Sequence, residues 1–324
     1  MKKNIPLLLG ACLLLAALGG CVPNNVPAQP EEKIRIISTI FAPCDFAKEI
    51  AGEHAEVTML LPPGAESHSY EPTPQDIIKI QNCDVFVYVG GDSDAWVEEI
   101  LGSLDTANMR IITLMDCVDV VEEEIVEGME DAHDEHAHDE HAHDEHGERE
   151  YDEHVWTSPK NAKIIVRKIS DTLCEVDAAN AGTYAQNTAA YLAQLDKLDA
   201  RFQAIVDSAA HKTLIFGDRF PFRYFADAYG LEYFAAFPGC ATETEASAAT
   251  IAFLIDKVKA EGIPVVFHVE LSNQKMANTI SEETGAKALL FHACHNVTRD
   301  EMANGVTYIE LMSQNAENLK EALR

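Results

Sequence analysis

Residues 191–205, YLAQLDKLDARFQAI, carry the pattern that decides the architecture of this chain. Their apolar positions, spaced by four and three, are Tyr191, Leu195, Leu198, Phe202 and Ile205. This spacing puts the apolar side chains on one face of a helix. Helical spacing continues over residues 178–209, which predicts a helix roughly 45 Å long at 1.5 Å per residue. A helix of that length can pass from one lobe of a protein to another.

Strand patterns alternate with helical patterns on both sides of this long helix. Apolar and β-branched runs predict strands at 34–39, 56–61, 84–89, 110–114, 213–216, 264–269 and 287–291. Such alternation indicates an α/β fold of two lobes, each with a parallel sheet flanked by helices, joined by one long helix. Ligands of open parallel sheets bind beyond the carboxyl ends of the strands, so we expect a site in the cleft between the lobes.

The first residues have the features of a secretory signal peptide. Lys2 and Lys3 precede an apolar run over residues 5–18, which is short for a membrane span. Leu18-Gly-Gly-Cys21 then resembles a bacterial lipobox, which predicts lipidation of Cys21. The expected divisions are a signal peptide (1–21), a linker (22–33), an N-terminal lobe (34–157), a helical connector (158–210) and a C-terminal lobe (211–324).

An acidic, histidine-rich stretch closes the N-terminal lobe at residues 122–153. The chain has a formal net charge of −30, which argues against binding nucleic acid and favours attraction of cations. A repeat, Asp-Glu-His-Ala-His, begins at Asp134. Histidine-rich tracts of this composition are typical of metal binding, so we expect a mobile loop that gathers metal for a fixed site. Its histidines are His133, His136, His138, His141, His143 and His146.

Five further histidines lie at predicted strand ends or helix starts, where a cleft site would be built. These are His68, His154, His268, His292 and His295. Imidazole is a ligand for zinc, copper and nickel. Their common placement favours a shared metal site over unrelated structural histidines.

Several motifs resemble the zinc/manganese-binding solute-binding lipoproteins of metal ABC transporters, of the zinc-specific type with a histidine-rich loop. The motifs are His68-Ser-Tyr-Glu-Pro-Thr-Pro, Gly90-Gly-Asp-Ser-Asp-Ala-Trp, His154-Val-Trp-Thr-Ser-Pro, Tyr224-Phe-Ala-Asp-Ala-Tyr-Gly-Leu, Glu245-Ala-Ser and Tyr308-Ile-Glu-Leu-Met-Ser-Gln-Asn. The likeness covers essentially the whole mature chain in the same order. It implies two α/β lobes bridged by a long helix, and capture of a metal ion for delivery to a membrane permease.

The resemblance carries the family's ligands over only in part. His68 and His154 match the first two ligand histidines, and His292 matches an acid after the last strand. Arg219 stands at the third histidine position, and a guanidinium does not ligate metals. We therefore predict a site of His68, His154 and His292, with Asp218, His268 and His295 as weaker candidates. Arg219 is expected instead to pair with a nearby acid and fix its loop.

Three imidazoles with an open fourth position suit Zn²⁺ in a near-tetrahedral site. Mn²⁺, the alternative cargo, prefers more carboxylate oxygens. Glu71 and Glu153 lie close to the expected ligands in sequence and are candidate acceptors for imidazole N–H groups.

The resemblance also implies a disulfide in the second lobe between Cys240 and Cys294. Two free thiols are the alternative. A third possibility makes Cys294 a metal ligand, which an oxidising exterior disfavours.

The sequence thus predicts a monomeric zinc-binding protein, lipid-anchored to the outer face of the cytoplasmic membrane, that feeds an ABC permease with its ATPase. An enzyme is not expected, because the chain has no His-Glu-x-x-His motif, nucleophile elbow or phosphate-binding Gly-rich loop. A manganese importer component and a surface adhesin or metal buffer are the alternatives.

Overall fold

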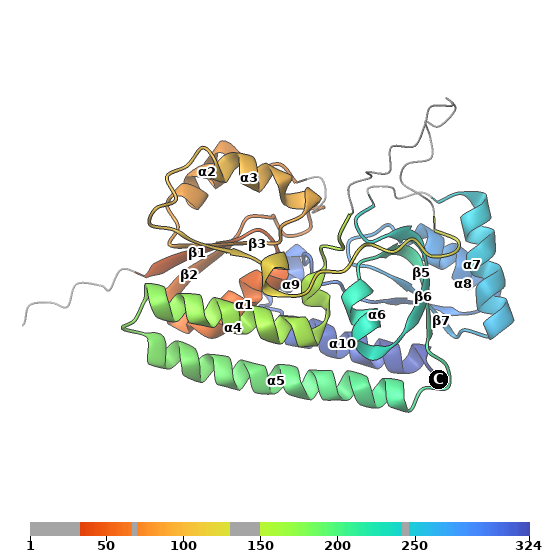
Figure 1. Ribbon diagram of the computed structural model, residues 1–324. Helices are drawn as coiled ribbons and strands as arrows, with labels where there is room; N and C mark the ends of the chain where they lie inside the picture. The colour runs from red at the N-terminus through yellow and green to blue at the C-terminus, as the bar shows by residue number, and fades with distance from the viewer. Residues whose placement is uncertain (1–32, 67–69, 130–149, 242–245) are drawn as a thin grey trace, which may run out of the picture. The chain divides into compact units, whose positions relative to one another are not determined.

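The computed structural model describes residues 33–324 apart from 67–69, 130–149 and 242–245. Within these ranges the strands form two four-stranded parallel sheets (Figure 1). The first, in the order β2-β1-β3-β4, contains β1 (Ile34–Ser38), β2 (Ala55–Met59), β3 (Val85–Tyr88) and β4 (Arg110–Thr113). The second, in the order β6-β5-β7-β8, contains β5 (Thr213–Phe220), β6 (Glu232–Pro238), β7 (Val265–His268) and β8 (Lys287–Leu290). The predicted α/β class with two parallel sheets is confirmed.

Helices connect the strands of both sheets. Those in the first half are α1 (Phe41–Ala51), α2 (Pro74–Gln81) and α3 (Ala95–Leu101). Those in the second half are α6 (Arg223–Tyr229), α7 (Ala248–Glu261), α8 (Lys275–Thr284), α9 (Arg299–Ala303) and α10 (Tyr308–Ala322). Thr73 caps α2 by accepting the backbone N–H of Asp76, as its place before Pro74 predicts.

The long helix is α5 (Ala181–Asp207), which follows α4 (Pro159–Val176). Its 27 residues span about 40 Å, somewhat less than the sequence predicted. Helix α5 contacts α1 and α4 of the first half and α6 and α10 of the second (Figure 1). Val206 continues its buried face after Phe202, and the predicted Ile205 is partly buried and packs against the same core.

The strands predicted from the sequence do not include β6, and β5 runs on to Phe220 instead of ending at residue 216. Gly230 ends α6 in the left-handed conformation, and Glu232–Pro238 then runs parallel to β5. The segment reads EYFAAFP, in which paired alanines weaken the strand signal. The register of β5 against β6 shifts between Phe216 and Arg219, which carries β5 on to Phe220.

One apolar core cluster contains residues from both halves of the chain. Residues Lys33–Arg324 form one compact unit. The ring of Phe46 in α1 packs against the ring of Tyr308 in α10, with 4.9 Å between their centroids, and lies 6.0 Å from the ring centroid of Tyr191 in α5. Trp156, completely buried, belongs to the same cluster. Across the described residues, every helix is too short or too polar to cross a membrane.

Candidate metal centre

His154 lies directly before the short turn Val155–Thr157 that leads into α4, and its side chain is completely buried. Its backbone N–H donates to Asp152 Oδ1 at 2.8 Å, and its Nδ1 lies 3.1 Å from the same oxygen. Burial lowers the pKa of His154, but the carboxylates of Asp152, Glu153 and Glu123 outweigh burial and raise the pKa overall. A carboxylate beside Nδ1 favours the tautomer that presents Nε2 as the metal-binding nitrogen.

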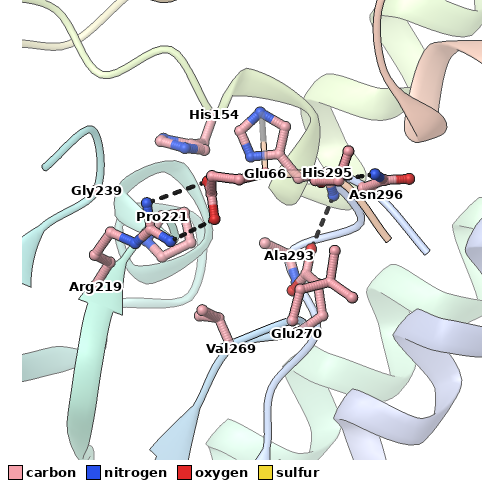
Figure 2. Close-up of a pocket in the computed structure, with 12 residues that line it drawn as sticks. Glu66, His154, Arg219, Pro221, Gly239, Val269, Glu270, Ala293, His295 and Asn296 are labelled. Carbon is pink, nitrogen blue, oxygen red and sulfur yellow. Dashed lines mark hydrogen bonds and ion pairs between the residues drawn. The ribbon is translucent and has the colours of Figure 1, made fainter. Parts of the chain in front are cut away.

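A cavity beside His154 is lined from both halves of the chain (Figure 2). Glu66 comes from the loop after β2, Arg219 from β5, Glu270 from the loop after β7 and His295 from the loop after β8. The rings of His154 and His295 are perpendicular, with 5.2 Å between their centroids. Two imidazoles therefore meet at one cavity beyond the carboxyl ends of the parallel strands.

The loop that carries His295 is held through its backbone. Glu270 accepts the N–H of Ala293 at 2.7 Å with Oε2 and the N–H of His295 at 3.1 Å with Oε1. Trp156 Nε1 donates to the carbonyl of Ala293 at 2.8 Å. The N–H of Phe41 donates to the carbonyl of His295 at 2.9 Å. His295 is thus fixed by groups from both halves of the chain.

The same loop is tied to the segment that precedes residues 67–69. The side-chain amide of Asn296 donates to the carbonyl of Pro62 at 2.8 Å and to that of Ala65 at 2.9 Å. The N–H of Gly64 donates to the carbonyl of Val297 at 2.8 Å. These bonds hold the loop after β2 against the loop after β8.

His292 occupies a different position from the one its prediction as a ligand requires. It is 2% exposed and does not line the cavity, whereas His295 does. Its Nδ1 accepts the N–H of Cys294 at 2.9 Å. Its backbone N–H and carbonyl are both bonded to the side-chain amide of Asn315, at 2.7 and 2.8 Å. Of the weaker candidates, His295 is the one that the structure brings to His154.

Arg219 pairs with an acid, which confirms the role expected for it. Its guanidinium reaches Glu66 at 3.1 Å for the Nη2–Oε2 pair and 3.4 Å for the Nη1–Oε1 pair (Figure 2). Nη1 also donates to the carbonyl of Ala241 at 3.1 Å. A two-point guanidinium–carboxylate contact fixes orientation as well as distance. It joins the first half of the chain to the second at the rim of the cavity.

The other candidates among the described residues lie away from the cavity lining. His268 ends β7, with Nδ1 3.2 Å from the carbonyl oxygen of Val269. Asp218 accepts the N–H groups of Val269 and Arg219. Glu71 is exposed.

Glu153 is buried and accepts the N–H of Ser93 at 2.9 Å. Burial raises the pKa of Glu153. Glu153 and His295 both line a second, smaller cavity next to the first. Glu153 therefore lies close to the candidate centre, where it holds Ser93, while the carboxylate beside His154 Nδ1 is that of Asp152.

Several predicted residues lie outside the described ranges. They are His68, Cys21, Glu245 and the loop histidines His133, His136, His138, His141, His143 and His146. Over the ranges that are described, no group of three or more His, Cys, Asp or Glu side chains is arranged to hold a metal ion. The described part of the candidate centre is therefore a pair of imidazoles with flanking carboxylates.

The disulfide expected between Cys240 and Cys294 is not formed, and both residues are free thiols. Their surroundings differ. Cys240 lies near Glu153, Asp152 and Glu123, while Cys294 is completely buried near Glu270. Burial raises the pKa of both thiols well above the ordinary value, so neither is a ready thiolate ligand.

Sequence reasoning missed Glu270 and Asn296, which shape the centre without matching a motif. The sequence contains a local signal for each of these two residues. Glu270 follows β7 within two residues, and Asn296 follows His295 directly. Acids and amides just after parallel strands are placed at the edge where ligands bind.

The fold and the imidazole pair define a solute-binding protein for a metal ion. The family model "Zinc-uptake complex component A periplasmic" (ZnuA) matches residues 36–322. The chain therefore belongs to the ZnuA family, which confirms the predicted family of zinc-uptake solute-binding components.

Comparison with individual relatives supports the assignment to this family. The chain is 32% identical to the high-affinity zinc uptake system protein ZnuA of Bacillus subtilis, with 97% of this chain and 96% of that protein covered. It is also 32% identical to the zinc-binding lipoprotein AdcA of Streptococcus pneumoniae, of which it spans 61%. The crystal structure of the Zn(II)-bound ZnuA-like domain of that AdcA matches with a TM-score of 0.71 at 30% identity, over 90% of this chain and 99% of that one.

Proposed function

We propose that this chain binds Zn²⁺ in the cavity beside His154 and His295 and delivers the ion to the permease of an ABC importer with its ATPase. The observation that carries the proposal is the pair of imidazoles, 5.2 Å apart, at a cavity lined from both halves. His68 follows Glu66 by two positions in the sequence and completes the proposed set as a third imidazole.

His295 replaces His292 in this set because of its position. His295 lines the cavity, whereas His292 is buried behind the loop with Nδ1 already engaged. Asp152 supports His154 as an acceptor for the ring N–H, which is the usual partner of a metal-binding histidine.

The donor set favours zinc over manganese. The carboxylates at the cavity are already engaged, Glu66 with Arg219 and Glu270 with two backbone N–H groups. Imidazole nitrogens therefore dominate the donors that remain. Zinc accepts three imidazoles and an open position, whereas manganese prefers carboxylate and water oxygens.

The remaining parts of the proposal rest on the sequence. Cys21 would carry the lipid that holds a monomeric domain at the outer face of the cytoplasmic membrane. The loop histidines at 133–146 would raise the local zinc concentration, since histidine-rich tracts bind the ion and these residues shortly precede His154 in the sequence.

Zinc and manganese titration of the mature domain, in competition with a chelator of known affinity, tests the proposal. We expect one tight zinc site that survives deletion of residues 131–150 and is lost in His154→Ala and His295→Ala. Tight binding that disappears with the loop, or preference for manganese, contradicts it. In cells, loss of the protein should impair growth only when zinc is scarce, which separates uptake from an adhesin.

A further inference from the structure

We infer that His292 and Glu270 are positioning residues that preset the backbone around His295, with His292 acting as a hydrogen-bond acceptor rather than as a metal ligand. The inference rests on the proposed zinc site and assigns supporting roles to two residues that do not bind the ion. It follows from where each polar group of the 292–296 loop finds its partner.

The loop turns sharply at Cys294, whose φ is +59°. Non-glycine residues seldom adopt this left-handed conformation, which persists only where the surroundings enforce it. The three successive N–H groups of Ala293, Cys294 and His295 all have acceptors inside the protein. Glu270 takes the outer two and His292 Nδ1 takes the middle one.

The role of His292 follows from its nitrogen atoms. Because Nδ1 accepts the N–H of Cys294 at 2.9 Å, the neutral ring carries its proton on Nε2. Nε2 is buried and has no hydrogen-bond partner in the described part of the chain. Asn315 holds the backbone of His292 on both sides, and turning the ring would break the bond that Nδ1 accepts from Cys294.

Glu270 supports the same turn from the opposite side. Its side chain is 9% exposed and lies 3.6 Å from His292 Nδ1, measured to Oε1. Each carboxylate oxygen accepts one N–H of the turn, at 2.7 and 3.1 Å. An amide in its place could accept only one of them, because its –NH₂ group is a donor.

Together these contacts fix His295 before a metal arrives. The backbone N–H and carbonyl of His295 are both bonded, so the point from which its side chain extends is set relative to His154. Such prior ordering lowers the entropy that binding must remove, and it tightens the site without adding a donor.

Two substitutions of His292 test this assignment, because asparagine and glutamine each place an amide where one of the two ring nitrogens lies. In His292→Asn, the amide oxygen occupies the place of Nδ1 and can still accept the Cys294 N–H. In His292→Gln, an amide group reaches the place of Nε2 and the acceptor at Nδ1 is lost. We expect the Asn variant to bind zinc within about 3-fold of wild type, and the Gln variant to lose about 10- to 100-fold, as outer supporting residues do.

The visible spectrum of bound Co²⁺ separates positioning from ligation. At saturating Co²⁺, His292→Asn and Glu270→Gln should keep the band positions of wild type, because the donor atoms are unchanged. Glu270→Gln should also bind zinc 10- to 100-fold more weakly, because the turn that carries His295 loses one of its acceptors. His295→Gln should change the bands and weaken binding most. Thermal unfolding of each metal-free variant verifies that it is folded.

The inference is overturned if His292→Asn loses affinity and spectrum like His295→Gln, or if His292→Gln binds like wild type. Glu270→Gln at wild-type affinity also overturns it, and this variant decides the matter if neither His292 variant folds. Failure of the proposed zinc site itself looks different, since then neither His154→Ala nor His295→Gln would weaken binding.

Discussion

A buried carboxylate, Asp45, offers a sharp prediction about stability and pH. Asp45 lies on α1 and is 5% exposed. One of its oxygens, Oδ2, accepts both the backbone N–H of Tyr308 at 2.9 Å and the hydroxyl of Tyr191 at 3.3 Å. An asparagine oxygen can take both bonds, so Asp45→Asn removes the charge and keeps the contacts.

The magnitude follows from the pKa of Asp45. Burial raises it from 3.8 to about 6, against the opposing hydrogen bond from Tyr308. A raised carboxyl pKa means that the folded state holds its proton more tightly than the unfolded state. The stability due to that proton is full below about pH 3.8 and is lost as pH rises through about 6. The difference corresponds to about 3 kcal/mol at 1.36 kcal/mol per pKa unit.

We therefore expect Asp45→Asn to unfold like wild type near pH 4 and to be more stable by about 3 kcal/mol at pH 7.5. Urea denaturation of the metal-free mature domain over this pH range measures the difference. A constant difference across pH, or lower stability of the variant at pH 7.5, refutes the reasoning.

Asp76→Asn is the control of opposite sign. Burial raises the pKa of Asp76, but hydrogen bonds from Lys79 and Thr73 outweigh it and lower the pKa to about 2. The stability that Asp76 contributes is present above pH 3.8 and is lost as pH falls toward 2. Its asparagine variant should therefore be less stable than wild type at pH 7.5, where Asp45→Asn is more stable.

Three further changes act on the candidate centre. Asp152→Asn should weaken zinc binding about 10- to 100-fold and should lower the pKa of His154. NMR titration of the metal-free protein should therefore show a lower midpoint for His154, and an unchanged midpoint would count against the pairing. Gly239→Ala would place a Cβ 3.1 Å from His154 Cε1 and 3.0 Å from a backbone oxygen, so zinc affinity should fall in chelator competition; wild-type affinity would show that the ring yields freely. Trp156→Phe leaves the buried carbonyl of Ala293 without its 2.8 Å bond and should lower the unfolding free energy by about 1–3 kcal/mol in urea, whereas no loss would mean that another donor replaces it.

The sequence was sufficient for the architecture because its signals are local. Spacing along residues 191–205 marks the long helix, and Thr73 before Pro74 marks the start of α2. Strand β6 was missed for the opposite reason. Its alanines have little strand preference of their own, and pairing with β5, some twenty residues earlier, decides its conformation.

The choice between His292 and His295 could not be made from spacing. Both residues follow β8 within five positions, so either could face the cavity. Which of the two lines the cavity depends on the left-handed turn at Cys294 and on Glu270, which lies more than twenty residues away in the sequence. Alignment to an acidic family position favoured His292, whose Nδ1 accepts the N–H of Cys294 and which does not line the cavity.

The bonds of Asn296 to Pro62 and Ala65 bear on how the protein folds. Asn296 and Pro62 are 234 positions apart, so their contact forms only after most of the chain has been synthesised. Contacts of such separation are slow to form, because a long loop must close first. Docking of these two loops should therefore come late in folding, after each sheet has formed. Zinc added during refolding should leave the early kinetic phases unchanged and act on the last one.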